Sequence, residues 1–142
     1  MTDTAARTPI PRIISVDDHI VEPPHLWQTW LPQRFRERGP RVERRRLGEM
    51  RWVGGATMYE YELDAPDAPW CDVWFYEDLV HPNKRHVAAV GFERDEMTLS
   101  PITYKEMRPG CYDVDARIAD MDLAGIWAML NFPSQVTGFC GR

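Results

Sequence analysis

Residues 13–24 read Ile-Ile-Ser-Val-Asp-Asp-His-Ile-Val-Glu-Pro-Pro, a short apolar run that leads directly into two carboxylates, a histidine and a third carboxylate. β-Branched residues dominate the start of this stretch, so residues 12–16 are predicted to form a short buried strand. The polar residues then follow at the C-terminal end of that strand. Pro23 and Pro24 end the extended segment, because proline cannot donate to a sheet ladder.

The spacing of these polar residues suits a metal ion. Residues two apart on a strand point to the same face, so Asp17 and His19 converge while Asp18 points away. Oxygen and imidazole ligands together fit a divalent metal such as zinc. In a barrel of parallel strands, the C-terminal strand ends are where active sites are built. The alternative is that the Asp-Asp pair only caps or turns the chain.

Length and charge restrict the classes of function. A chain of 142 residues fits one domain, and it is much shorter than the about 250 residues of a complete eight-stranded α/β barrel. The formal net charge of −5 argues against a nucleic-acid partner. No apolar stretch approaches the about 18 residues of a membrane-spanning helix, so we expect no membrane span.

The cysteines and the N-terminus predict a cellular location. Residues 1–11 form a polar leader that lacks the apolar segment of a signal peptide, and we expect it to be disordered. The three cysteines, Cys71, Cys111 and Cys140, are widely spaced and odd in number. This pattern predicts reduced thiols in a cytoplasmic protein and not a disulfide framework.

A basic run lies between Arg34 and Arg51, where eight arginines stand among three glutamates. Such a run is either a patch that binds phosphate or acidic groups, or a solvated face. The interspersed glutamates favour the solvated face.

Turn and propensity signals predict several short elements. Short helices are expected over residues 25–30 and 33–38, with the second ending at a Gly-Pro pair. Residues 51–63 are expected to form a hairpin around a Gly-Gly turn, and residues 73–76 a short strand. Residues 81–109 show little periodicity and are expected to be irregular.

The block from Asp113 to residue 132 predicts a helix followed by a strand. Asp113 is a favourable N-cap and Gly125 a favourable residue just beyond the last turn. Val114, Ile118 and Met121 are spaced to form one apolar face of the helix. Residues 126–132 are continuously apolar apart from one asparagine, which is typical of a parallel strand covered on both faces.

Three stretches, in this order and at this spacing, resemble one known family. Residues 16–23 resemble the opening motif of the amidohydrolase-related family, in the branch of the amidohydrolase superfamily that contains aminocarboxymuconate-semialdehyde decarboxylase-like enzymes. Residues 106–113 and residues 117–126, with the strand that follows, match the same family. The resemblance covers residues 12–142. Over this range the chain is similar to the N-terminal part of a long bacterial subgroup whose members carry a large insertion, here about residues 40–110.

The resemblance implies an α/β fold, namely the N-terminal fragment of a (β/α)8 TIM-barrel metallohydrolase that consists of the first two barrel strands and a long β-hairpin and loop insertion. It also implies one divalent metal, usually zinc. Asp17 and His19 map onto the family's first metal-ligand motif, and Glu22 would be a further ligand or would orient one. The implied chemistry is hydrolysis, or decarboxylation of a small aromatic or unsaturated carboxylate.

The remaining ligands of that family are histidines after the middle strands and an aspartate near the last strand, and all would lie beyond residue 142. We therefore expect the isolated chain to be inactive, since a catalytic zinc site needs three protein ligands. The alternative is a non-catalytic split or truncated module that associates with a companion chain carrying the rest of the barrel, or with copies of itself.

Other polar and aromatic residues have plainer interpretations. His25, close to Glu22 in sequence, is either part of the same cleft or a surface turn residue, and the second is favoured. His81 and His86 lack metal-ligand spacing. Cys111 and Cys140 are expected to be structural and not nucleophilic. A further aromatic group is expected to belong to the core in preference to a substrate pocket or an interface; it consists of Trp70, Trp74, Phe75 and Tyr76.

Overall fold

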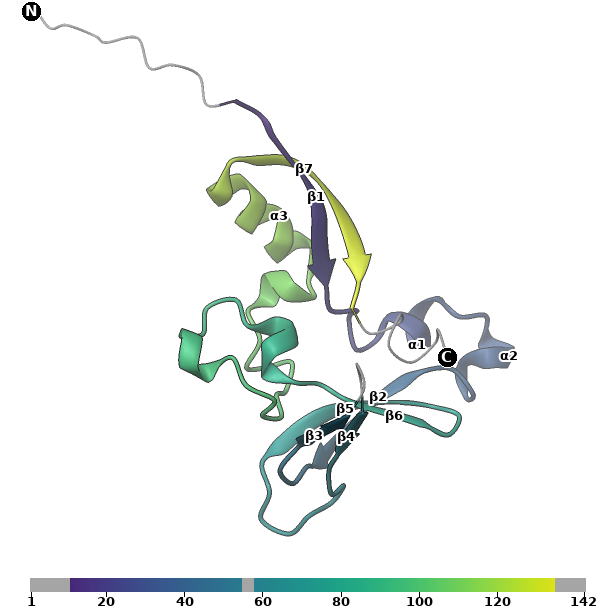
Figure 1. Ribbon diagram of the computed structural model, residues 1–142. Coiled ribbons are helices and arrows are strands. Elements are labelled where there is room, and N and C mark those ends of the chain that lie inside the picture. The colour runs from purple at the N-terminus through teal and green to yellow at the C-terminus, as the bar shows by residue number, and fades with distance from the viewer. Residues whose placement is uncertain (1–10, 55–57, 135–142) are drawn as a thin grey trace, which may run out of the picture.

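The computed structural model describes residues 11–54 and 58–134, which form a mixed α/β fold (Figure 1). The predicted leader, apart from Pro11, and Cys140 lie outside these residues. In chain order the helices and strands are β1 (Ile13–Ile20), α1 (Leu26–Trp30), α2 (Gln33–Arg36), β2 (Arg41–Arg46), β3 (Arg51–Gly54), β4 (Met58–Glu60), β5 (Trp70–Tyr76), β6 (Leu79–Pro82), the 3-10 turns η1 (Arg85–Ala88), η2 (Arg94–Glu96) and η3 (Pro109–Cys111), α3 (Val114–Ala124) and β7 (Ile126–Pro133).

The first and last strands pair with each other. β1 and β7 form a two-stranded parallel sheet, and α3 connects back along it, so the three elements make a β-α-β unit (Figure 1). The predicted strand start was right but its end was wrong, because β1 continues through Ile20. After an irregularity between Ser15 and Asp18, the pairing resumes, with Asp18 opposite Asn131 and His19 opposite Phe132. The polar residues therefore belong to the strand itself.

The predicted helix is confirmed at both ends. The Asp113 carboxylate accepts a hydrogen bond from the Ala116 N–H at 2.9 Å, and Gly125 adopts a left-handed conformation with φ of 69°, which glycine adopts without steric cost. The predicted apolar face is only partly correct. Val114 is 70% exposed and Ile118 51%, whereas Arg117 and Met121 on the sheet side are half-buried.

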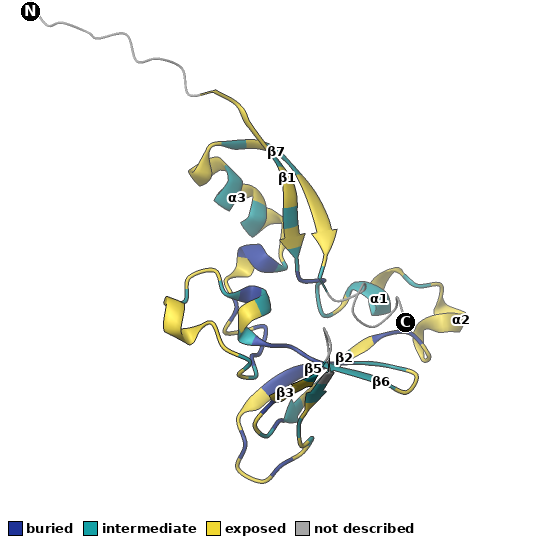
Figure 2. Cartoon of the chain, viewed as in Figure 1, coloured by how far each residue is buried: buried dark blue, intermediate teal, exposed yellow. Residues whose placement is uncertain are grey.

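The prediction of buried strands is wrong for β1 and β7. Val16 is 65% exposed and Trp127 59%. Figure 2 shows exposed residues along the length of both strands. Within the described residues this sheet has only two strands, and α3 packs against it. Each strand therefore has one edge without a ladder partner among the described residues, and apolar side chains remain in contact with solvent.

The part of the sequence between β1 and β7 forms two antiparallel sheets. β5 is the central strand of a three-stranded sheet in the order β2-β5-β6, and β3 pairs with β4. The predicted antiparallel pairing of the hairpin arms is thus confirmed, while its Gly-Gly turn runs into residues outside the described ones. The predicted strand at residues 73–76 is confirmed as the second half of β5. Two strands were missed. β2 arises from the arginine-rich run, whose charged residues concealed its extended conformation, and β6 completes a tight hairpin with β5.

The buried core lies around β5 and not around the parallel sheet. Cys71, Val73 and Trp74 of β5 are fully buried. The prediction that the aromatic group belongs to the core is confirmed for Trp74 and wrong for Trp70, which is 48% exposed, while Phe75 and Tyr76 pack against the core from partly buried positions. Trp74 packs in one cluster with residues of the segment 102–111 and with Val21, directly after β1. The insertion is therefore packed against the end of β1.

Asp72 is the buried carboxylate of this region. Arg44 donates two hydrogen bonds to it, both at 2.9 Å, and the Tyr104 backbone N–H donates a third at 2.8 Å. The side chain of Asp72 is almost completely buried. Its charge is compensated within the fold, as a buried carboxylate requires.

We expect the substitution Asp72→Asn to lower the free energy of unfolding by about 2 kcal/mol, because it removes the negative charge that pairs with Arg44 and exchanges one acceptor oxygen for a donor group. Urea denaturation followed by tryptophan fluorescence measures this. The matched control is Asp64→Asn, which breaks an exposed pair with Arg45 and should have little effect. Equal losses for the two variants would contradict the structural role of Asp72.

Candidate functional site

Asp17 and His19 lie together on one face of β1. The His19 Nε2 atom is 3.8 Å from the Asp17 Oδ1 atom, and the two side chains are 61% and 87% exposed respectively. Asp18 points to the opposite face, where its Oδ1 atom is 3.6 Å from the Arg117 Nη2 atom of α3. The predicted alternation is therefore confirmed: an imidazole and a carboxylate share a face at the C-terminal end of a parallel strand.

The surroundings of His19 restrict its ring and its backbone. The imidazole lies 5.9 Å from the Phe132 ring of β7, centroid to centroid. Arg117 donates a long hydrogen bond of 3.4 Å to the His19 carbonyl. The ring is thus supported on one side by an aromatic neighbour, while its outer side remains open to a ligand.

Glu22 lies in a different environment from Asp17 and His19. Only 3% of its surface is exposed, and its carbonyl accepts a hydrogen bond from the Tyr104 hydroxyl at 2.7 Å. Burial raises the pKa of Tyr104, so this hydroxyl stays protonated and remains a donor. Glu22 is consequently fixed in the core that adjoins the end of β1.

Asp17 and His19 fit two positions of a zinc site, because zinc accepts both carboxylate oxygen and imidazole nitrogen. Within residues 11–54 and 58–134, no group of three or more histidine, cysteine, aspartate or glutamate side chains is placed to hold a metal ion. The structure therefore does not bring Glu22 into such a group with the other two predicted ligands.

The remaining candidates have structural positions. His25 is exposed at the start of α1. Cys111 is buried, and burial raises the pKa of its thiol, which disfavours the nucleophilic thiolate. Burial lowers the pKa of His86. His81 lies on β6 opposite Trp74, in keeping with a role in the sheet.

A cavity of about 330 Å³ opens at the same end of the parallel sheet. It lies between α1 and the first turn of α3, and its lining includes Ile20, His25, Tyr112, Arg117 and Asn131. Because Arg117 lies on the Asp18 face of β1, this cavity is not on the face that carries Asp17 and His19.

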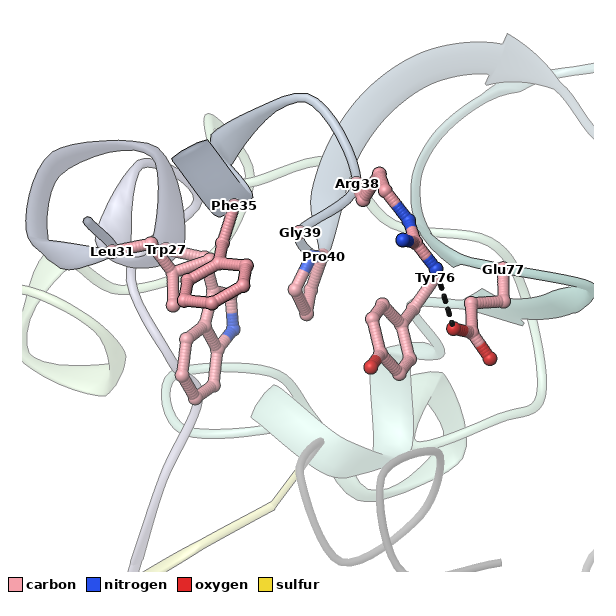
Figure 3. A pocket seen from close by; sticks show the side chains of 8 residues that line it. All are labelled: Trp27, Leu31, Phe35, Arg38, Gly39, Pro40, Tyr76 and Glu77. Carbon is pink, nitrogen blue, oxygen red and sulfur yellow. Dashed lines mark ion pairs between the residues drawn. The ribbon is translucent and has the colours of Figure 1, made fainter. Parts of the chain in front are cut away.

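A second cavity, of about 360 Å³, is lined mainly by apolar side chains (Figure 3). Trp27 and Phe35 from the two short helices lie across from Tyr76 at the end of β5, and Arg38 and Glu77 form an ion pair at 4.0 Å beside them. Its size is that of a small-molecule site. Sequence reasoning missed it because its two walls are distant in sequence.

The arginines of β2 are paired within the protein. Arg44 binds Asp72, Arg45 binds Asp64 and Glu43, and Arg41 binds Glu43. Arg46 donates to the Ala68 carbonyl at 2.6 Å and lies over the Trp70 ring at 3.9 Å. The other four arginines of the basic run, Arg34, Arg36, Arg38 and Arg51, are exposed, as the solvated-face interpretation predicts. β2 itself is not an open anion-binding patch, because its guanidinium groups are engaged by carboxylates and a carbonyl of the chain.

A salt bridge fixes α3 to the turn before it. Arg108 Nε donates to an Asp120 carboxylate oxygen at 2.8 Å, and Arg108 Nη2 donates to the other oxygen at 2.5 Å. Gly110 permits this approach, since a Cβ atom there would lie 2.2 Å from the same carboxylate. The hydrogen bonds from Arg108 lower the pKa of Asp120.

Comparison with known proteins leaves the family unassigned. No protein-family model matches the chain, and no curated protein matches it at a significant level. In the part of the chain that the structure describes, no helix has the length and apolar character needed to cross a membrane.

The pKa of Asp120 is lowered in the folded protein by its ion pair with Arg108. The Arg108–Asp120 pair therefore stabilises the fold at neutral pH, and this contribution is lost as the pH falls below about 4. We expect Asp120→Asn to make the urea midpoint fall less steeply than in the wild type between pH 5 and pH 3. Arg108→Gln should also make the urea midpoint depend less on pH, since it removes the guanidinium groups that donate to Asp120. Curves parallel to the wild type for both variants would refute this assignment.

Proposed function

We propose that residues 12–142 form the first part of a metal-dependent amidohydrolase-type barrel enzyme, a hydrolase or decarboxylase of a small organic substrate. The observation that carries the proposal is the Asp17–His19 pair, 3.8 Å apart on one face at the C-terminal end of a parallel strand. The β-α-β arrangement around it is the repeating unit of such a barrel.

In this proposal Asp17 and His19 bind a divalent metal, most suitably zinc, and Glu22 orients the end of the strand from its buried position. A metal bound there supplies polarisation of a substrate oxygen or a water of lowered pKa. The chain's own part is to present a carboxylate and an imidazole at a fixed separation. Phe132 limits the positions that the imidazole can take.

The exposed surfaces of the β-α-β unit support the barrel assignment. Both strands have an outer edge without a partner among the described residues, and apolar side chains of β1, β7 and α3 are exposed. Further β-α units placed at these edges would bury this surface and add the remaining ligands. The isolated chain is therefore expected to show no turnover.

A second candidate function uses the same exposed surface without chemistry. In it the chain is a non-catalytic module that associates with a companion chain, or with copies of itself, through the open strand edges. Metal binding separates the two candidates, because only the first assigns a role to Asp17 and His19. In either case we infer a cytoplasmic protein, since Cys71 and Cys111 are free and buried.

The zinc proposal is tested by titrating the purified chain with zinc chloride and recording the imidazole signals of its histidines by NMR. We expect the signals of His19 to shift, with weak affinity because only two protein ligands are present. Asp17→Asn should weaken the binding and His19→Gln should abolish it. The matched control, His25→Gln, alters an exposed histidine nearby and should leave the shift unchanged. Zinc effects that avoid His19 would refute the proposal.

A further inference from the structure

Arg117 lies beneath the metal-ligand pair, on the opposite face of β1. It belongs to the side of α3 that packs against the sheet, and its side chain is mostly buried, with 20% exposed. The sequence alone indicates no individual role for it. It is the single lysine or arginine of α3.

The guanidinium of Arg117 joins three segments of the chain. It donates to the His19 carbonyl of β1 at 3.4 Å, to the Asn131 side-chain oxygen of β7 at 3.2 Å and to the Gly110 carbonyl of η3 at 3.3 Å. A further contact of 3.1 Å joins its Nε atom to the Met129 sulfur. A planar group with several fixed donors can make these contacts together, whereas a lysine ammonium cannot.

β1 is irregular directly before His19. Ser15 lies opposite Met129 and Asp18 opposite Asn131, so two residues of β1 face one residue of β7 in between. This is a β-bulge, which interrupts the ladder and changes the direction of nearby side chains. The bulge contains Asp17. Ladder hydrogen bonds alone therefore leave the direction of Asp17 less firmly fixed than in a regular strand.

Asp18 depends on Arg117 for its charge compensation. One carboxylate oxygen lies 3.6 Å from Arg117 Nη2, and the other is buried with no hydrogen-bond partner among the described residues. Loss of the guanidinium would leave a partly buried carboxylate without its cation, which favours rotation of Asp18 towards solvent. Because Asp18 stands between Asp17 and His19, such a movement would disturb both.

We propose that Arg117 is a positioning residue that holds the bulged end of β1 so that Asp17 and His19 face one metal ion. The part of this role that concerns metal binding rests on the proposed function. The positioning of the strand by Arg117 does not depend on it. Substitution of groups that orient metal ligands ordinarily lowers metal affinity by about 10- to 100-fold.

The test compares Arg117→Lys and Arg117→Met with the wild-type chain, and uses Arg108→Lys as the matched control. Arg108 also fixes α3, through Asp120, but in the part of the chain that the structure describes it makes no hydrogen bond to β1. Without metal, we expect Arg117→Lys to speed hydrogen exchange of the amides of residues 18–20 about tenfold, and to leave the first residues of β1 unchanged. With zinc chloride, the affinity measured at His19 should fall about tenfold. Arg108→Lys should change neither.

The outcomes are distinguishable. Faster exchange spread evenly over β1, β7 and α3, or unchanged exchange at residues 18–20, would overturn the role of Arg117, because either indicates only a general contribution to stability. Unchanged zinc affinity in Arg117→Lys would also overturn it. If the wild-type chain shows no zinc effect at His19 but Arg117→Lys shows the local exchange change, the proposed function fails and the positioning of the strand stands. Arg117→Lys carries the test if Arg117→Met does not fold.

Discussion

The buried carboxylate of Asp72 is the constraint on which the packed part of the protein depends. A charge with almost no exposed surface must be matched inside the fold, and Asp72 meets this requirement by binding Arg44 from β2 and the backbone of Tyr104. Tyr104 in turn donates to the Glu22 carbonyl just beyond β1 and accepts from the Trp74 indole. Segments far apart in sequence are thereby fixed around β5, and the end of β1 is fixed with them.

The end of β1 is thus held from two directions. The insertion holds Val21 and Glu22 from one side, through the Cys111 carbonyl and the Tyr104 hydroxyl. α3 holds His19 from the other, through Arg117. A strand that carries a bulge has fewer ladder bonds to resist distortion, so these backbone and side-chain hydrogen bonds from other segments supplement the ladder. The position of His19 relative to Asp17 therefore depends on packing around the end of β1 as well as on the ladder.

Local signals made part of this fold predictable. The cap at Asp113, the left-handed Gly125 and the alternation of Asp17, Asp18 and His19 each depend on residues next to one another, and the structure bears them out. Strand β2 was not predictable in this way. A run of arginines carries no strand signal in the sequence, and two of the carboxylates that pair with Arg44 and Arg45 are distant in sequence. Arg117 and the two cavities depend on contacts between distant segments, which spacing in the sequence does not encode.

The distribution of burial links the open site to the open sheet. The residues around β5 bury their apolar side chains among themselves. By contrast, β1, β7 and α3 form a β-α-β unit whose apolar side chains are largely exposed. Hydrophobic burial is the main source of folding free energy, so the β-α-β unit draws its stability from the ladder, the Arg117 bonds and the adjacent insertion. An additional strand beside β1 or β7 would bury apolar surface and, from its C-terminal end, would place side chains beside Asp17 and His19. One packing event would therefore both stabilise the sheet and bring further side chains next to the pair.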